Sequence, residues 1–164
     1  MRLTLRAHAI RGSVLVALVA LTACSTSPTP AVRSEVATRQ ITATSQCGFD
    51  EPGLVYMDSR QRLDEVTGTR GINLTAMNDH DFNREHLLLI GAGRKPTGGY
   101  GVALEEGWLE GDLLELTVTL RSPAADQMVT QALTSPCAVV AVPAQGWHSV
   151  QVRGTGFPEL SLNR

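Results

Sequence analysis

The sequence predicts an all-β fold, a small antiparallel β-sandwich or compact barrel with room for one short helix. The first observation is the alternation in residues 113–120 (LLELTVTL), where Leu114, Leu116, Val118 and Leu120 share one face and polar residues share the other. A period of two is typical of a half-buried antiparallel strand. The second observation is a series of short apolar runs separated by Gly and Pro, which favours many short strands joined by turns.

The remaining elements follow from shorter patterns. Continuous apolar runs and short alternating segments predict further strands at 54–57, 86–90, 100–104, 107–109, 138–142 and 147–152. The runs at 86–90 (HLLLI) and 138–142 (AVVAV) are apolar throughout, as buried strands are. Helical turns are expected only at 59–66 (SRQRLDEV) and at 125–133.

Residues 1–23 have the pattern of a secretory signal peptide. Arg2, Arg6 and Arg11 precede an apolar run of eight residues from Val14 to Leu21. A transmembrane helix needs about 20 apolar residues, whereas the apolar part of a signal peptide has about 7 to 15. The sequence therefore predicts an exported protein whose first segment is removed.

The end of this segment, Leu21-Thr22-Ala23-Cys24, resembles the bacterial lipobox. The resemblance implies that Cys24 carries acyl chains such as palmitate and becomes the new N-terminus. Two or three chains give stable membrane attachment, because each buried CH₂ contributes about 0.8 kcal/mol. Ser25 stands where an Asp often signals inner-membrane retention, so we expect the periplasmic face of the outer membrane if the source has two membranes. The alternative is an ordinary cleaved signal peptide with an unrelated cysteine.

Behind Cys24, residues 25–45 are rich in Ser, Thr, Ala and Pro, so 24–45 is predicted to be the lipidated cysteine followed by a flexible tether. We expect one folded domain over 46–155 and a C-terminal tail over 156–164. Removal of residues 1–23 takes three of the 14 basic residues, leaving 11 against 16 acidic ones, a net charge of −5. Lys95 is the only lysine, and this acidic balance argues against a nucleic-acid partner.

Two cysteines remain after lipidation, Cys47 and Cys137. Because the protein is expected in an oxidising compartment, these two thiols are predicted to pair as a disulfide. A metal site or a reactive thiol is the alternative, but neither a Cys-x-x-Cys nor a His-x-Cys spacing supports it. We expect no bound metal and no cofactor.

A glycine-rich loop is the candidate binding site of the chain. It is made of Lys95, Pro96, Thr97, Gly98, Gly99 and Tyr100. Its glycines allow a backbone that a partner approaches closely. It is not a phosphate-binding loop, since Lys95 precedes Pro96 rather than Ser or Thr and a strand is expected to follow. The alternative is that the loop only shapes a turn, with Tyr100 buried in the core.

No catalytic constellation can be assembled from the polar residues. The most compact cluster is Asn78-Asp79-His80-Asp81, and neither it nor His86 and His148 supplies a nucleophile, a base and an orienting group. We therefore expect a protein that is not an enzyme. Trp108 and Trp147 are interpreted as core or rim residues, with interface anchors as the alternative.

Residues 81–104 (DFNREHLLLIGAGRKPTGGYGVAL), the segment 129–136 (VTQALTSP) and the strand at 138–142 together resemble the PrcB C-terminal family. The resemblance implies a noncatalytic β domain. Members are typically exported or lipid-anchored bacterial proteins, and the founding member is an accessory lipoprotein of a cell-surface protease complex. The partner implied is thus another envelope protein, with a protease as one candidate. The Thr134-Ser135-Pro136 turn is expected to join the loop as presented surface.

The loop from Lys95 to Tyr100 is also similar to one loop of chagasin-type cysteine protease inhibitors, which are β-sandwiches. Their Arg-Pro-Trp sequence does not occur here, and Gly146-Trp147-His148 only loosely takes its place. Peptidase inhibition is therefore an alternative function, and a structural envelope lipoprotein is another.

Overall fold

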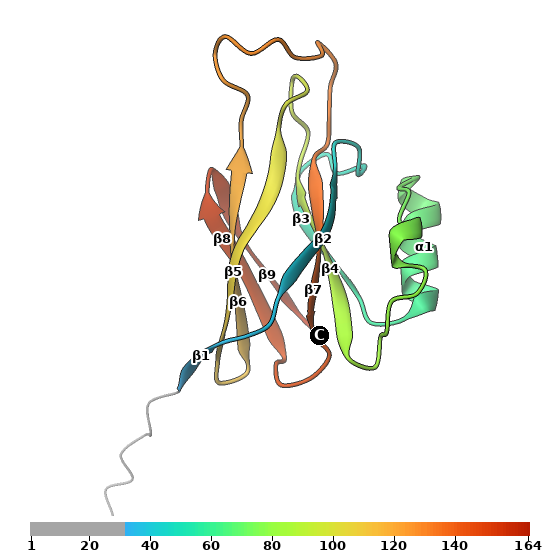
Figure 1. Cartoon of the computed structure of the whole chain (residues 1–164), viewed down its shortest axis with the longest axis vertical. Helices are drawn as coiled ribbons and strands as arrows, with labels where there is room; N and C mark the ends of the chain where they lie inside the picture. The colour runs from blue at the N-terminus through green and yellow to red at the C-terminus, as the bar shows by residue number, and fades with distance from the viewer. Residues whose placement is uncertain (1–31) are drawn as a thin grey trace, which may run out of the picture. The chain divides into compact units, whose positions relative to one another are not determined.

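The structure is a computed structural model that describes residues 32–164 (Figure 1). The predicted signal peptide and the lipidation site Cys24 lie outside the described residues. The strands are β1 Arg33–Glu35, β2 Arg39–Thr44, β3 Pro52–Met57, β4 Glu85–Ala92, β5 Gly101–Glu110, β6 Leu113–Arg121, β7 Cys137–Pro143, β8 Ser149–Thr155 and β9 Phe157–Asn163. The helix α1 spans Arg60–Arg70, and a 3-10 turn, η1, spans Thr75–Met77. Across residues 32–164, no helix is long and apolar enough to cross a membrane.

The strands form two sheets, which confirms the predicted all-β sandwich with one short helix. One sheet has the order β1-β5-β6-β8-β9 and the other has the order β2-β7-β4-β3. All strand pairs are antiparallel except β6 and β8, which run parallel. The connection between these two strands passes through β7 in the other sheet, so it crosses between the layers (Figure 1).

Two buried clusters explain the apolar runs in the sequence. The first lies between the sheets and includes Leu88 and Val140 from one sheet and Leu116 from the other. The second lies between α1 and the sheet that carries β4, and includes Leu63 of the helix and Leu89 of the strand. Because β4 and β7 are covered on both faces, every position along them can be apolar. β6 is covered on one face only, which is why its sequence alternates.

The helix α1 begins and ends at recognisable capping residues. The Ser59 hydroxyl accepts a hydrogen bond from the backbone N–H of Arg62 at 3.3 Å, and Gly71 takes a left-handed conformation (φ 64°) just after the last turn. Leu63 and Val66 are its buried side chains. The helix predicted at 59–66 is therefore confirmed, and it continues four residues further.

The first described segment changes sheets, which corrects the predicted tether over 24–45 from residue 33 onward. β1 pairs with β5 in one sheet, and β2 then pairs with β7 in the other. The sequence hides both strands because β1 has three exposed residues and β2 contains a bulge between Gln40 and Thr42 that interrupts its alternation. The domain therefore begins near Arg33 rather than at residue 46.

Four other predictions need correction. The expected tail over 156–164 forms the edge strand β9, in which Leu160 and Leu162 pack against the inter-sheet cluster. The strands predicted at 100–104 and 107–109 are one strand, β5, with an irregular register between Leu104 and Glu106. The strand predicted at 147–152 begins only at Ser149. Residues 125–133 contain no helix, because they belong to a long loop that pairs with another loop instead.

Candidate functional site

The candidate loop Lys95–Tyr100 joins β4 to β5 at one end of the sandwich, beside the long connection between β6 and β7 (Figure 1). This connection, residues 122–136, is called the bracing loop. Pro96 and Gly99 of the candidate loop are exposed, and the other four residues are partly buried. Tyr100 belongs to neither buried cluster, so the alternative of a core tyrosine does not hold.

Backbone hydrogen bonds join the candidate loop to the bracing loop. Lys95 and Thr134 exchange two of them, at 2.8 Å from Lys95 N–H and 3.0 Å from Thr134 N–H. The Gly98 N–H donates to the Thr130 carbonyl at 2.8 Å. In addition, the Thr134 hydroxyl donates to the Thr97 carbonyl at 2.7 Å. The two loops therefore behave as one paired unit rather than as two independent loops.

Gly99 permits this close approach. Its φ is +86°, and a Cβ atom there would lie 2.8 Å from Val129 Cγ1 and 2.9 Å from Pro123 Cβ. Both facts require glycine, since an L-residue is strained at positive φ and the added carbon would collide with the bracing loop. The glycine content that suggested a binding loop thus has a packing reason at this position.

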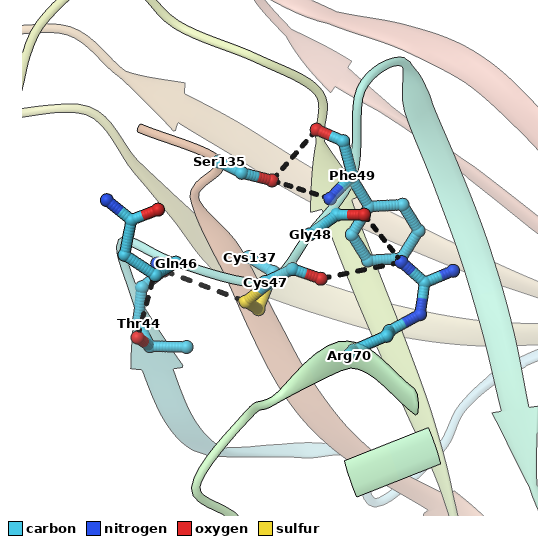
Figure 2. The surroundings of a disulfide bond; sticks show 8 residues. All are labelled: Thr44, Gln46, Cys47, Gly48, Phe49, Arg70, Ser135 and Cys137. Atoms are coloured by element: carbon cyan, nitrogen blue, oxygen red, sulfur yellow. Dashed lines mark hydrogen bonds between the residues drawn. A yellow bond between two sulfur atoms is a disulfide. The ribbon is translucent and has the colours of Figure 1, made fainter. Parts of the chain in front are cut away.

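The bracing loop is in turn fixed to the body of the domain at Ser135. Its hydroxyl accepts from the Phe49 N–H at 2.7 Å and donates to the Phe49 carbonyl at 2.9 Å (Figure 2). Thr134 and Ser135 are 7% and 8% exposed. The expectation that the Thr134-Ser135-Pro136 turn is presented surface is therefore wrong: the turn is buried and supports the loops from below.

The predicted disulfide between Cys47 and Cys137 is present next to this anchor point, with its Cα atoms 6.1 Å apart (Figure 2). It links the segment after β2 to the first residue of β7. Backbone hydrogen bonds run beside it, from Cys47 N–H to the Ser135 carbonyl at 2.9 Å and from Ser135 N–H to the Ser45 carbonyl at 2.8 Å. The covalent bond therefore joins the same segments as the hydrogen bonds.

Phe49 connects this region to the helix. The Arg70 guanidinium lies over its ring at 4.0 Å and donates to the Gly48 carbonyl at 3.0 Å (Figure 2). On its other side the ring fills the space above Gly91, where a Cβ atom would lie 2.2 Å from it. The end of α1, the segment 46–49 and β4 are thus packed together beneath the loops.

The exposed apolar residues of this end lie on the bracing loop. Met128 is 98% exposed and Leu133 is 62% exposed. Leu133 also lines a cleft of about 330 Å³ together with Phe49 and Arg94, and Arg94 forms an ion pair with Asp50 at its rim. Sequence reasoning missed Met128 and Leu133 because residues 125–133 were expected to form helical turns, in which apolar residues usually face the core.

The polar residues considered for catalysis lie outside the candidate loop and the bracing loop and have structural contacts. The Asp81 carboxylate accepts from the Asn83 N–H at 3.0 Å, which makes a turn before β4. One ring nitrogen of His80 lies 2.8 Å from the Glu85 carbonyl oxygen. Over the described range 32–164, no group of three or more His, Cys, Asp or Glu side chains could hold a metal ion.

The structure also defines the contacts and burial of the remaining histidines and of the two tryptophans. His86 lies on β4 as predicted, with its Nδ1 atom 2.5 Å from the Tyr56 hydroxyl. Burial of its imidazole lowers the pKa of His86, and the charge of Arg164 lowers it further. His148, expected on a strand, instead precedes β8 and is exposed. Trp147 is 1% exposed and belongs to the inter-sheet core, while Trp108 is partly buried below Arg33.

Comparison with known proteins gives one match. No curated protein and no solved structure matches the chain. The family model described as PrcB C-terminal matches residues 87–143. This segment runs from within β4 to the end of β7 and so contains both the candidate loop and the bracing loop. The resemblance to the PrcB C-terminal family is therefore confirmed for residues 87–143, the part of the chain that builds the paired loops.

Proposed function

We propose that this chain is a noncatalytic lipoprotein, anchored to a bacterial membrane through Cys24, whose β domain binds another protein of the cell envelope. The binding surface is the loop end, defined as the candidate loop together with Met128 and Leu133 of the bracing loop. An envelope protease is the first partner to test, because the PrcB resemblance implies an accessory role in a protease complex.

The observation that carries the proposal is the construction of the loop end. Exposed apolar side chains stand on a loop that is joined to the candidate loop by three backbone hydrogen bonds and one from the Thr134 hydroxyl. A surface that is ordered before binding loses less conformational entropy when a partner covers it. Apolar side chains on such a surface also gain more from burial than exposed polar ones.

A pull-down tests the binding surface directly. The lipidated protein is isolated from its native membranes after mild crosslinking, as wild type and as the variants Met128→Asp and Leu133→Asp. If these side chains are central to the interface, each change costs about 2 kcal/mol, or roughly 30-fold in affinity. Partner recovery should therefore fall to background while the purified domain keeps its stability.

Val32→Asp is the matched control. Val32 is also an exposed apolar residue, at 80%, but it adjoins β1 rather than the loops. The same charge introduced there should leave partner recovery unchanged. Equal recovery with all three variants would contradict the proposed binding surface. Inhibition of papain-like or subtilisin-like proteases by the purified domain alone would support the chagasin-type alternative instead.

A further inference from the structure

The chain enters the folded domain at the end opposite to the loops. β1 is the first described strand, and its first residue, Arg33, pairs with Glu110 at the far end of β5. The other end of β5 follows Tyr100 and the candidate loop. In Figure 1, β1 lies at the bottom of the sandwich and the two loops lie at the top. The loops and the point of entry are therefore separated by the length of a strand.

The connection to the proposed anchor is short. Only eight residues, 25–32, lie between Cys24 and Arg33. A polypeptide spans at most about 3.3–3.6 Å per residue, so this connection reaches no further than about 32 Å when fully extended. A flexible chain of that length has an r.m.s. span of about 17 Å.

The domain is about as long as the connection 25–32 would be if it were fully extended; this connection is called the tether below. A strand rises about 3.3 Å per residue, so β5 with its ten residues covers about 30 Å, and both loops continue beyond it. To point the loops straight at the bilayer, with the strands along the bilayer normal, Arg33 would have to lie more than this distance from it. That arrangement requires a fully extended tether, which is entropically unfavourable.

We infer that the anchored domain turns its loop end away from the bilayer and its β5–β6 turn towards it. The inference rests on the proposed anchor at Cys24 and concerns the same binding surface. It restricts the partner to a soluble protein or the water-exposed domain of a membrane protein, because a membrane-spanning segment does not reach the loops. The short connection between Cys24 and β1 therefore limits the kind of partner as well as the orientation of the domain.

Fluorescence quenching in vesicles tests the orientation. The lipidated protein, with its disulfide intact, carries one added cysteine for a fluorophore, either Asp112→Cys in the β5–β6 turn or Met128→Cys in the bracing loop. Both side chains are exposed, Asp112 at 76% and Met128 at 98%. The proteins are placed in phosphatidylethanolamine and phosphatidylglycerol vesicles whose head groups carry a short-range quencher. The label at position 112 should be quenched several-fold more strongly than the label at position 128.

A lengthened tether provides the matched control. An insert of about 20 Gly and Ser residues between Pro30 and Ala31 raises the r.m.s. span to about 30 Å, so the domain can turn over and the difference between the labels should shrink. Equal quenching of both labels at the native tether length, or stronger quenching at position 128, would overturn the inference. Mass spectrometry showing no acyl chains on Cys24 would overturn the proposed anchor itself, and the inference with it.

Discussion

The Ser135 hydroxyl binds the backbone of Phe49 on both of its polar groups, accepting from the N–H at 2.7 Å and donating to the carbonyl at 2.9 Å. Both bonds are buried, and Ser135 follows directly after Thr134, which holds the candidate loop. One hydroxyl thus connects the loop end to the segment that carries the disulfide.

Ser135→Ala should therefore destabilise the domain. The change leaves a buried N–H and a buried carbonyl of Phe49 without this partner, which costs about 1–3 kcal/mol. Urea unfolding of the purified domain measures the loss. Ser122→Ala, at an exposed serine of the same loop, is the control and should change the stability little. Equal stability of the two variants would show that the paired bonds do not contribute.

Reduction of the disulfide should lower the free energy of unfolding of the wild-type domain. Cys47 and Cys137 are 90 residues apart in sequence, and in the chain-entropy model a loop of that length stabilises by about 4.6 kcal/mol. The prediction is a lower urea midpoint in the presence of a reductant. A Cys47→Ala, Cys137→Ala double variant should show the low midpoint with and without reductant. A reductant effect that persists in this variant would contradict the assignment.

Two glycine-to-alanine changes should shift the stability of the domain in opposite directions. Gly154 lies at an irregularity between β8 and β9, where a Cβ atom would stand 1.6 Å from the Val118 carbonyl oxygen, so Gly154→Ala must displace backbone and destabilise the domain. Gly68 lies in α1 with no atom within 4 Å of its added carbon. Gly68→Ala should stabilise by about 0.5–1 kcal/mol through helix propensity. Thermal unfolding of both variants separates the two effects, and a gain in Tm from Gly154→Ala would refute the first.

The domain should lose stability in mild acid through His86. Its pKa is lowered in the folded state, chiefly by burial and then by the charge of Arg164. The unfolded chain therefore binds the proton more readily, and the contribution of neutral His86 is present above its unfolded pKa and is lost as the pH falls through the folded pKa. Of the other neighbours, the charge of Asp58 opposes the shift and that of His80 adds to it, while the Tyr56 hydroxyl contacts the ring.

Urea unfolding at pH 7.5 and at pH 5 measures this dependence, with His86→Gln as the test and His148→Gln as the control. His148 is exposed, with a side chain 78% accessible, so its replacement should preserve the pH dependence. His86→Gln should reduce the loss of stability at pH 5. If both variants keep the full dependence, another group is responsible.

The sequence predicted the fold best where one physical requirement dominates. The alternation in β6 reflects one buried face, with Leu114 and Leu116 fully buried, and the apolar runs of β4 and β7 reflect burial on both faces. The disulfide followed from the number of cysteines and the expected compartment. The strands β2 and β9 were missed because each pairs on one side only and, apart from Phe157, their apolar residues are partly exposed.

The candidate site was predicted only in part for a related reason. The glycines marked the candidate loop, but its pairing with the bracing loop depends on residues such as Thr130 and Thr134, which are far away in sequence. A hydroxyl residue just before a proline has the same local pattern whether it is exposed or buried. Ser135 is hydrogen-bonded to Phe49, and Thr134 to Lys95 and Thr97. No local pattern connects these residues to one another.

The strand that changes sheets has a mechanical consequence. A pull on Val32 acts first on β1, which pairs with β5 over three residues, and then on β2 along the edge of the other sheet. Peeling of the chain then stops at Cys47, because this residue is covalently bound to Cys137. Peeling of residues 33–46 would release about 50 Å of chain and stop there, leaving β3 to β9 and the paired loops intact. The disulfide thus separates a segment that force can peel away, residues 33–46, from a body that stays folded while this happens.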